Sequence, residues 1–145
     1  MKRVLNYIPF ILFTLAVVSF ILPVAYKKDE GMTLSYNSIE LIFGLNSQNV
    51  SPGLLIAFIL FIISIIFSVL VIKNPNNLKL SVSVIFGLVS GTLFFFSKIL
   101  ADPSLNGFNA HVGLILPGLF IIAGSVLLFI NTKIINTNKK DSVSD

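Results

Sequence analysis

Four long stretches of this sequence carry no charged side chain, and they constrain the fold more than any other feature. They run from Val4 to Tyr26, from Gly53 to Ile72, from Leu80 to Ser97 and from Val112 to Ile130. A helical span needs about 20 consecutive apolar residues to cross the hydrocarbon core of a bilayer. None of the stretches alternates apolar and polar residues as a transmembrane barrel requires. The sequence therefore predicts an all-α membrane protein, an antiparallel transmembrane bundle of four helices.

The composition agrees with lipid as the solvent, because 55% of the residues are hydrophobic and only 11% are charged. The net charge of +4 does not indicate a nucleic-acid partner, since the ten Lys and Arg residues lie singly or in pairs between apolar stretches. With no cysteine and His111 as the one histidine, we expect no disulfide, no metal site and no cofactor. The abundance of isoleucine and asparagine is typical of an AT-rich genome, so a low-GC bacterium is our hypothesis for the source.

Basic residues near the ends of the stretches predict the orientation, because the side richer in Lys and Arg is normally cytoplasmic. Seven of them lie on one side of the predicted membrane and three on the other. The larger group is Lys2, Arg3, Lys73, Lys79, Lys133, Lys139 and Lys140, and the smaller is Lys27, Lys28 and Lys98. We therefore expect a multi-pass protein of the cell membrane with both termini in the cytoplasm. A cleaved signal peptide is the alternative for the first stretch, which is long for that role and has Pro23 near the cleavage position.

The first outer loop, residues 27–52, contains a helix signal of its own. Asn37 and Glu40 have the spacing of a capping box, and Gly44 can end the helix. Ile39, Ile42 and Phe43 follow at i, i+3 and i+4. The pattern predicts a short amphipathic helix on the bundle or in the outer interface, preceded by a segment that could be extended. An irregular loop is the alternative.

The chain divides into a transmembrane domain, residues 1–132, and a polar cytoplasmic tail, residues 133–145. The tail is rich in Asn, Ser and Lys, and its apolar content is too low to predict a folded structure.

Small residues predict where the helices approach one another, because lipid provides no hydrophobic reason for helices to associate. The predicted packing residues are Ser83, Gly87, Ser90 and Gly91 in the third stretch and Gly113, Pro117 and Gly124 in the fourth. Ala57, Ser64 and Ser68 form a similar face in the second stretch. Packing within one chain accounts for all of these faces together. A homodimer interface or a pore lining is the alternative.

Catalytic signals are missing from the sequence. It has no carboxylate pair at membrane depth, no HExxH motif and no glycine-rich phosphate loop. An enzyme would require Glu40, Asp102 and His111 to converge from separate outer segments. We therefore expect a protein that is not an enzyme.

The sequence resembles small uncharacterised bacterial four-span (tetraspan) membrane proteins. The resemblance rests on the basic N-terminus, the first stretch ending near Pro23, the long first loop with Ser35 to Gly44, and three closely spaced later stretches. The topology is also similar to that of the claudin-like tetraspans, but the tryptophan and paired cysteines of claudin loops are missing. The resemblance implies an architecture and no chemistry.

These features together predict a small accessory or interaction subunit of the cytoplasmic membrane, with the lipid bilayer as its environment. An oligomeric pore-forming or transport subunit is the alternative. Ile39, Ile42 and Phe43 are the candidate contacts for a membrane-protein partner, because one short helix cannot bury their apolar face alone. The sequence leaves the oligomeric state open.

Overall fold

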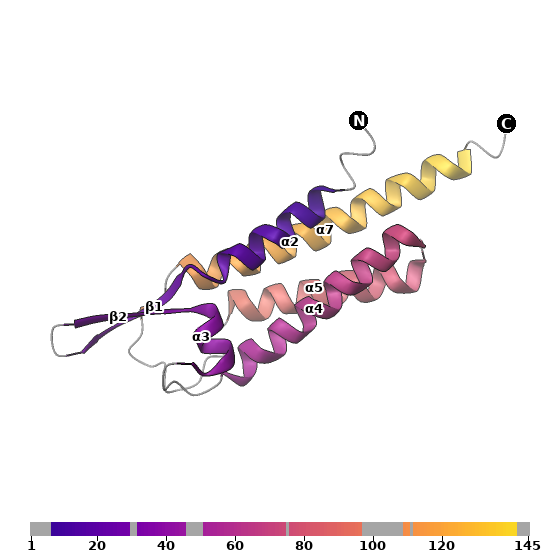
Figure 1. Ribbon diagram of the computed structural model, residues 1–145. Helices are drawn as coiled ribbons and strands as arrows, with labels where there is room; N and C mark the ends of the chain where they lie inside the picture. The colour runs from indigo at the N-terminus through magenta and orange to yellow at the C-terminus, as the bar shows by residue number, and fades with distance from the viewer. Residues whose placement is uncertain are drawn as a thin grey trace.

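The computed structural model describes residues 7–29, 32–45, 51–74, 76–96, 109–110 and 112–141 (Figure 1). Of these, residues 24–29, 32–36, 109–110, 112–114 and 134–141 are described by their backbone only. The elements in chain order are α2 (Ile8–Ser19), β1 (Pro23–Asp29), β2 (Met32–Asn37), α3 (Ser38–Phe43), α4 (Pro52–Lys73), α5 (Asn77–Phe95), β3 (Asn109–Ala110) and α7 (Val112–Asp141). Helices make up most of the described chain, as the sequence predicts.

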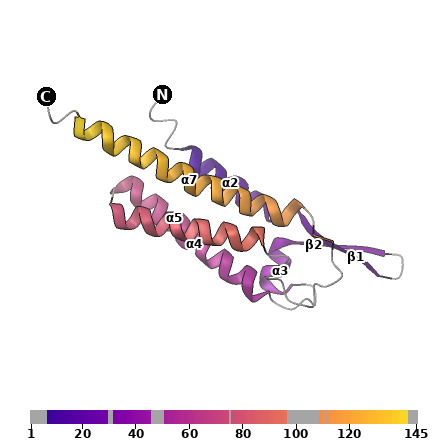
Figure 2. The ribbon, with the colours of Figure 1, turned by 180° about the vertical axis from the view of Figure 1, so that it is seen from behind.

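The long helices lie side by side, with α2 against α7, α7 against α5, and α5 against α4 (Figures 1 and 2). The start of α2, the end of α7 and the turn between α4 and α5 lie at one end of the molecule. The small sheet and α3 lie at the other end, and the β1–β2 hairpin projects beyond the helices. We call these the turn end and the sheet end.

Three helices are long and apolar enough to cross a membrane: Pro52–Lys73, Asn77–Phe95 and the segment Ile115–Lys133 of α7. They correspond to the second, third and fourth apolar stretches of the sequence. In the turn that joins α4 to α5, the Asn76 side chain caps α5 by accepting a hydrogen bond from the Leu78 N–H at 2.8 Å.

The first apolar stretch is a shorter helix than predicted. The sequence predicts a continuous helix from Val4 to Tyr26, but α2 ends at Ser19 and β1 begins at Pro23. Its 12 residues reach about 18 Å at 1.5 Å per residue. The N–H groups of Phe20, Ile21 and Leu22 each bond to the carbonyl three residues back, at 3.1–3.2 Å. This tighter turn ends at Pro23, which has no N–H and disfavours helical geometry in the residue before it.

The polar tail also differs from its prediction. The sequence predicts no folded structure after residue 132, whereas α7 continues as a helix to Asp141. Extending an existing helix costs far less than starting one, since each added residue brings one hydrogen bond.

A small antiparallel sheet is the feature that the all-α prediction misses. β1 pairs with β2, for example Tyr26 with Ser35, and β3 pairs with β1 through Ala25 and Ala110, giving the strand order β2-β1-β3. For the segment Gly31 to Tyr36 the sequence predicts only that it could be extended. Val, Thr and Tyr in β1 and β2 favour pleated structure, and the chain must reverse after Pro23 to reach α3.

The predicted short helix in the outer loop is confirmed as α3. The Asn37 side chain accepts from the Glu40 N–H at 2.9 Å, and the Glu40 carboxylate accepts from the Asn37 N–H at 2.8 Å. Both halves of the capping box are therefore present. Gly44 ends the helix with a φ of 64°, a left-handed conformation that glycine adopts without strain.

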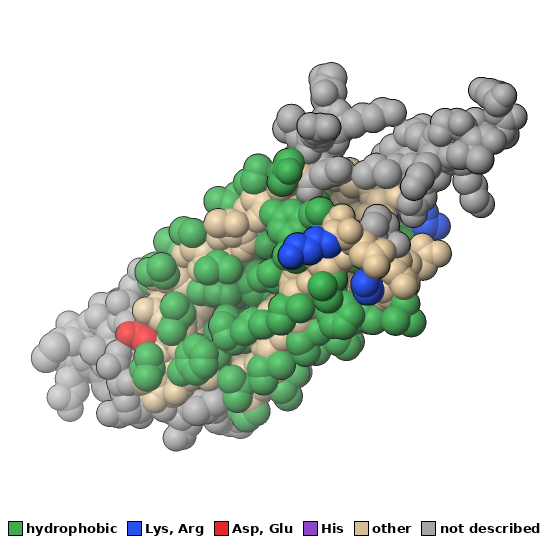
Figure 3. All heavy atoms as spheres, turned by 45° about the vertical axis from the view of Figure 1, so that its right-hand side comes forward, with side chains coloured by type: hydrophobic (Ala, Val, Ile, Leu, Met, Phe, Trp, Pro, Cys, Tyr) green, Lys and Arg blue, Asp and Glu red, His purple; other side chains and the backbone are tan. Residues whose placement is uncertain are grey.

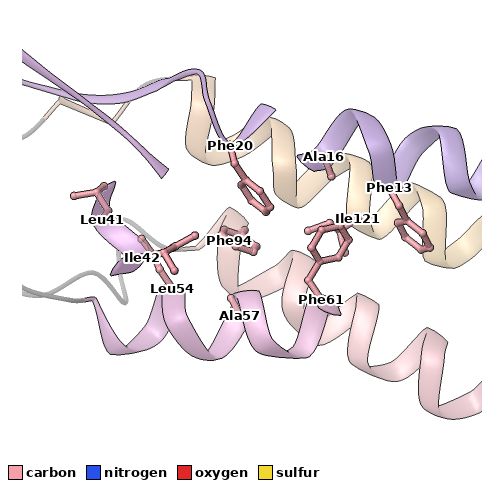
Figure 4. Packing of buried hydrophobic residues seen from close by; sticks show 10 residues of the cluster. All are labelled: Phe13, Ala16, Phe20, Leu41, Ile42, Leu54, Ala57, Phe61, Phe94 and Ile121. Atoms are coloured by element: carbon pink, nitrogen blue, oxygen red, sulfur yellow. The ribbon is translucent and has the colours of Figure 1, made fainter. Parts of the chain in front are cut away.

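The core between the sheet end and the middle of the helices is built around aromatic rings (Figure 4). Phe20 points from the end of α2 toward Phe61 and Phe94, with ring centroids 5.9 Å and 5.1 Å away. Leu41 and Ile42 of α3 belong to the same cluster. The chain between α2 and α4 is thus anchored to the helices by its own apolar side chains.

Candidate functional site

A seam of buried serines joins α4 to α5. We define the serine seam as Ser64 and Ser68 of α4 with Ser83 and Ser90 of α5, all of which are 0% exposed. The Ser64 hydroxyl donates to the Ser83 carbonyl at 2.8 Å, and the Ser83 hydroxyl lies 3.0 Å from the Ser64 carbonyl. Ser90 donates to the Ala57 carbonyl at 2.7 Å. Ser83 of α5 meets Ser64 of α4, and the later residue Ser90 meets the earlier residue Ala57. These two helices therefore run in opposite directions.

The hydroxyl protons of the seam are fewer than its contacts. Ser68 lies 2.8 Å from the Ser64 carbonyl and 2.7 Å from the Ser83 hydroxyl, where either oxygen can be the donor. Ser68 and Ser83 have one hydroxyl proton each. Together they take part in three contacts, one with each other and two with the Ser64 carbonyl. Two of these three contacts can therefore be hydrogen bonds at one time. Every serine of the seam has a partner within the chain. The arrangement satisfies polar groups that are buried between two apolar helices and links these helices.

Glycines bring α5 and α7 into contact on the side of α5 that faces α7. A methyl group added at Gly91 would lie 2.9 Å from the Gly118 carbonyl oxygen, and one added at Gly118 would lie 2.7 Å from the Gly91 carbonyl oxygen. Gly87 sits between Ser64 of α4 and Ser125 of α7, whose hydroxyl donates to the Ile121 carbonyl. Gly91 and Gly118 therefore mark a close approach of two backbones.

The remaining predicted packing residues lie on α7. Gly124 faces α2, where an added methyl group would meet the Phe13 ring at 2.7 Å. Pro117 is fully buried within the helix. Gly113 lies in the first turn of α7, among the residues that are described by their backbone only. The structure thus brings Ser83, Ser90, Gly87 and Gly91 together on α5, whereas α7 divides its small residues between two neighbours.

Two residues of this interface, Gly118 and Ser125, are absent from the predicted packing residues. Both lie on α7 and face α5, whereas Gly124 faces α2. Gly118, Ile121, Ser125 and Leu128 are spaced by three, four and three residues, and all four are buried. That spacing is the signal that could have identified a second packing face on this helix.

The candidate partner contacts of α3 differ in their exposure. Ile42 is 0% exposed, and Ile39 packs against the core. Ile42 is therefore covered within the chain, because α3 docks on α4. Phe43 is 48% exposed, and its ring lies edge-to-face with that of Phe58, with centroids 5.6 Å apart. Phe43 is the most exposed of the three.

Charge is segregated to the two ends of the described surface (Figure 3). Lysine side chains gather at one end, an acidic side chain lies at the other, and hydrophobic side chains cover the surface between them. Lys133 lies over the Phe129 ring at 5.2 Å from its centroid, a cation–π contact. Within the described residues no three His, Cys, Asp or Glu side chains are grouped as a metal site would need. Lys98, Asp102 and His111 lie outside the described residues.

No family model, curated protein or solved structure matches this chain. A functional assignment therefore rests on the geometry of the chain itself.

Proposed function

We propose that this protein is a small accessory or interaction subunit of the cytoplasmic membrane, without enzymatic activity, that crosses the bilayer four times as an antiparallel helical bundle. That the protein is a tetraspan, as the resemblance of its sequence implies, is part of this proposal.

The observation that carries the membrane assignment is the inverted polarity of α4. Ser64 and Ser68 are fully buried, whereas Ile59, Ile62 and Ile66 are 41–51% exposed. Only 28% of the apolar segment of α4 is buried, and 33% of those of α5 and α7. A protein folded in water buries isoleucine and exposes serine. In lipid an exposed isoleucine costs nothing, and buried hydroxyls can bond across helices.

A fourth crossing by α2 is supported by its position and its outer face. It packs along α7, one of the three long apolar helices. Ile11, Leu15 and Val18 are exposed on it, as expected of a lipid-facing surface. Ile8 to Leu22 reaches about 24 Å if the last three residues rise 2 Å each. This is somewhat less than the hydrocarbon thickness of about 30 Å, a mismatch that a locally thinner bilayer accommodates.

Both termini in the cytoplasm are supported by the described lysines. At the turn end, Lys73 ends α4, Lys79 lies in the first turn of α5 and Lys133 ends the apolar segment of α7. Lys139 and Lys140 lie in the last turn of α7 at the same end, whereas Lys27 and Lys28 lie in β1 at the sheet end. Glu40 lies in α3 at the sheet end. The side with the excess of lysine is normally cytoplasmic, so the turn end faces inward and the hairpin faces outward.

The accessory role is supported by the sheet end. The β1–β2 hairpin projects past the helices, and Phe43 of α3 stays half exposed at the same end (Figure 1). A rigid support that presents a projecting segment is the usual arrangement for binding another molecule. We therefore propose that a membrane-protein partner docks at the hairpin and Phe43.

Three measurements test this proposal. Reporters fused at residue 145 and in the turn between β1 and β2 should report opposite sides of the membrane, with the C-terminal reporter inside. Purified protein in liposomes should leave ion flux unchanged, while affinity purification in mild detergent should recover a membrane-protein partner. Ion flux that increases with protein concentration would instead identify an oligomeric pore subunit.

A further inference from the structure

A groove of about 290 Å³ opens between the beginning of α2 and the end of α4. It is lined by Tyr7 and Phe10 on one side and by Val69, Ile72 and Lys73 on the other, and its walls are apolar. Its volume is close to the lower limit of about 300 Å³ for small-molecule sites in proteins. The groove lies at the turn end of the molecule, at the level where Tyr and Lys are common in membrane helices.

The groove exists because α2 and α4 meet through aromatic rings nearer the sheet end. Phe13 contacts Phe61 with centroids 5.9 Å apart, and Phe20 contacts Phe58 at 5.8 Å. Phe10 packs edge-on against Phe13 at 6.2 Å, which places it at the boundary between the packed part and the groove. From this point to Tyr7 the space between the two helices is open.

Lys73 gives the groove a positive rim. It is the last residue of α4 and is exposed. Glu40 holds the one carboxylate among the described side chains, and it bonds to the Asn37 N–H at the sheet end. The start of α2 and the end of α4 have opposite partial charges. Among the described side chains that line the groove, Lys73 is the charged one and makes the local potential positive.

We propose that an anionic phospholipid occupies this groove, with part of one acyl chain along Phe10, Val69 and Ile72 and its phosphate beside Lys73. The proposal rests on the membrane location proposed above. The apolar stem of Lys73 can follow the groove wall while its ammonium group stays in the headgroup layer.

The lining favours a lipid over other occupants. A soluble metabolite would find apolar walls that form no hydrogen bonds, whereas an acyl chain requires none. A second copy of the chain that docked symmetrically through the same groove would bring the same lysine, and therefore a like charge, to the rim. An anionic headgroup complements the lysine, and a zwitterionic one does so less well.

The experiment uses the full-length protein in nanodiscs made of equal amounts of phosphatidylglycerol and phosphatidylcholine, with retained lipids identified by native mass spectrometry. We expect bound phosphatidylglycerol in preference to phosphatidylcholine. Lys73→Gln should lower that preference about fivefold, the effect of one basic residue near an anionic surface. Lys79→Gln is the matched control, because Lys79 lies at the same end and does not line the groove.

A second pair of variants tests the apolar part. Val69→Trp should fill the groove and reduce retention of both lipids, while Ile56→Trp, at an exposed position near the other end of the same helix, should not. Equal losses in Lys73→Gln and Lys79→Gln, or no preference in the wild type, would overturn the proposal. A dimer that dissociates on Val69→Trp would also overturn it, by assigning the groove to a second copy. If the reporter fused at residue 145 shows that the protein does not insert into the membrane, the proposed function is overturned as well. If the protein inserts but shows no lipid preference, only the proposal of a lipid in the groove is overturned.

Discussion

The contact between Gly91 and Gly118 gives the sharpest quantitative prediction, because a single methyl group meets backbone atoms there. An alanine Cβ at residue 91 would lie 2.6 Å from Ile122 Cγ1 and 2.9 Å from the Gly118 carbonyl oxygen. The second distance is about 0.5 Å short of the 3.4 Å at which ordinary contact begins. Ile122 Cγ1 can move with its side chain, but the carbonyl is fixed in α7. Gly91→Ala therefore forces α5 and α7 apart.

Two opposing effects set the magnitude. Overpacking a well-packed contact costs about 1–3 kcal/mol. Alanine regains about 1 kcal/mol over glycine inside a helix. We expect Gly91→Ala to lower the free energy of unfolding by up to about 2 kcal/mol, and Gly91→Leu to lower it further. Gly118→Ala should cost a similar amount, since its Cβ would meet the Gly91 carbonyl oxygen at 2.7 Å and the Phe95 backbone nitrogen at 2.9 Å.

The variant that carries both alanines is the decisive one. Either alanine separates the same two helices, so the second methyl group should enter a gap that the first has already opened. We expect the double variant to lose clearly less than the two single losses combined, as coupled neighbours do. The assay is reversible unfolding of the monomer in detergent, followed by circular dichroism at the helix signal.

Val89→Ile is the matched control, because it adds one methyl group to the exposed side of α5. It should leave the free energy of unfolding unchanged. Losses that simply add in the double variant would refute the shared contact. Unchanged monomer stability together with loss of a cross-linked dimer would show that these glycines pack between chains.

Three further predictions concern other parts of the fold. Ser83→Ala should cost about 0.6 kcal/mol, the average for a hydrogen bond between membrane helices, whereas Ser81→Ala on the exposed side of α5 should cost nothing in the same unfolding assay. Ile42→Ser should destabilise the sheet end by about 1.5–3 kcal/mol and increase hydrogen exchange of α3. Phe43→Ser should instead keep the fold and weaken recovery of the partner. The reverse pattern would contradict the docking of α3. Asn37→Ala should cost about 0.5–2 kcal/mol through loss of the capping box, and α3 protection unchanged in hydrogen exchange would count against it.

Much of the local structure could be predicted from the sequence, because short-range chemistry decides it. The caps at Asn37 and Asn76 and the left-handed turn at Gly44 each depend on a few neighbouring residues. Three of the four apolar stretches correspond to helices of spanning length, since length and hydropathy suffice to predict them. The end of α2 is not predicted although Pro23 signals it, because the apolar residues on both sides of the proline favour a longer helix.

The sequence by itself determined which residues are apolar, where small residues recur and which segments can be helical. The tertiary structure decided which neighbour each face meets, as in the division of Gly118 and Gly124 between α5 and α2. It also decided that Ile42 is covered by the chain itself, and that β3 joins β1 across most of the sequence. Helical periodicity identifies a face but not its partner, and lipid makes all apolar faces nearly equivalent. The choice among them depends on the close fit of glycines, serine hydroxyls and aromatic rings, which forms only when the helices come together.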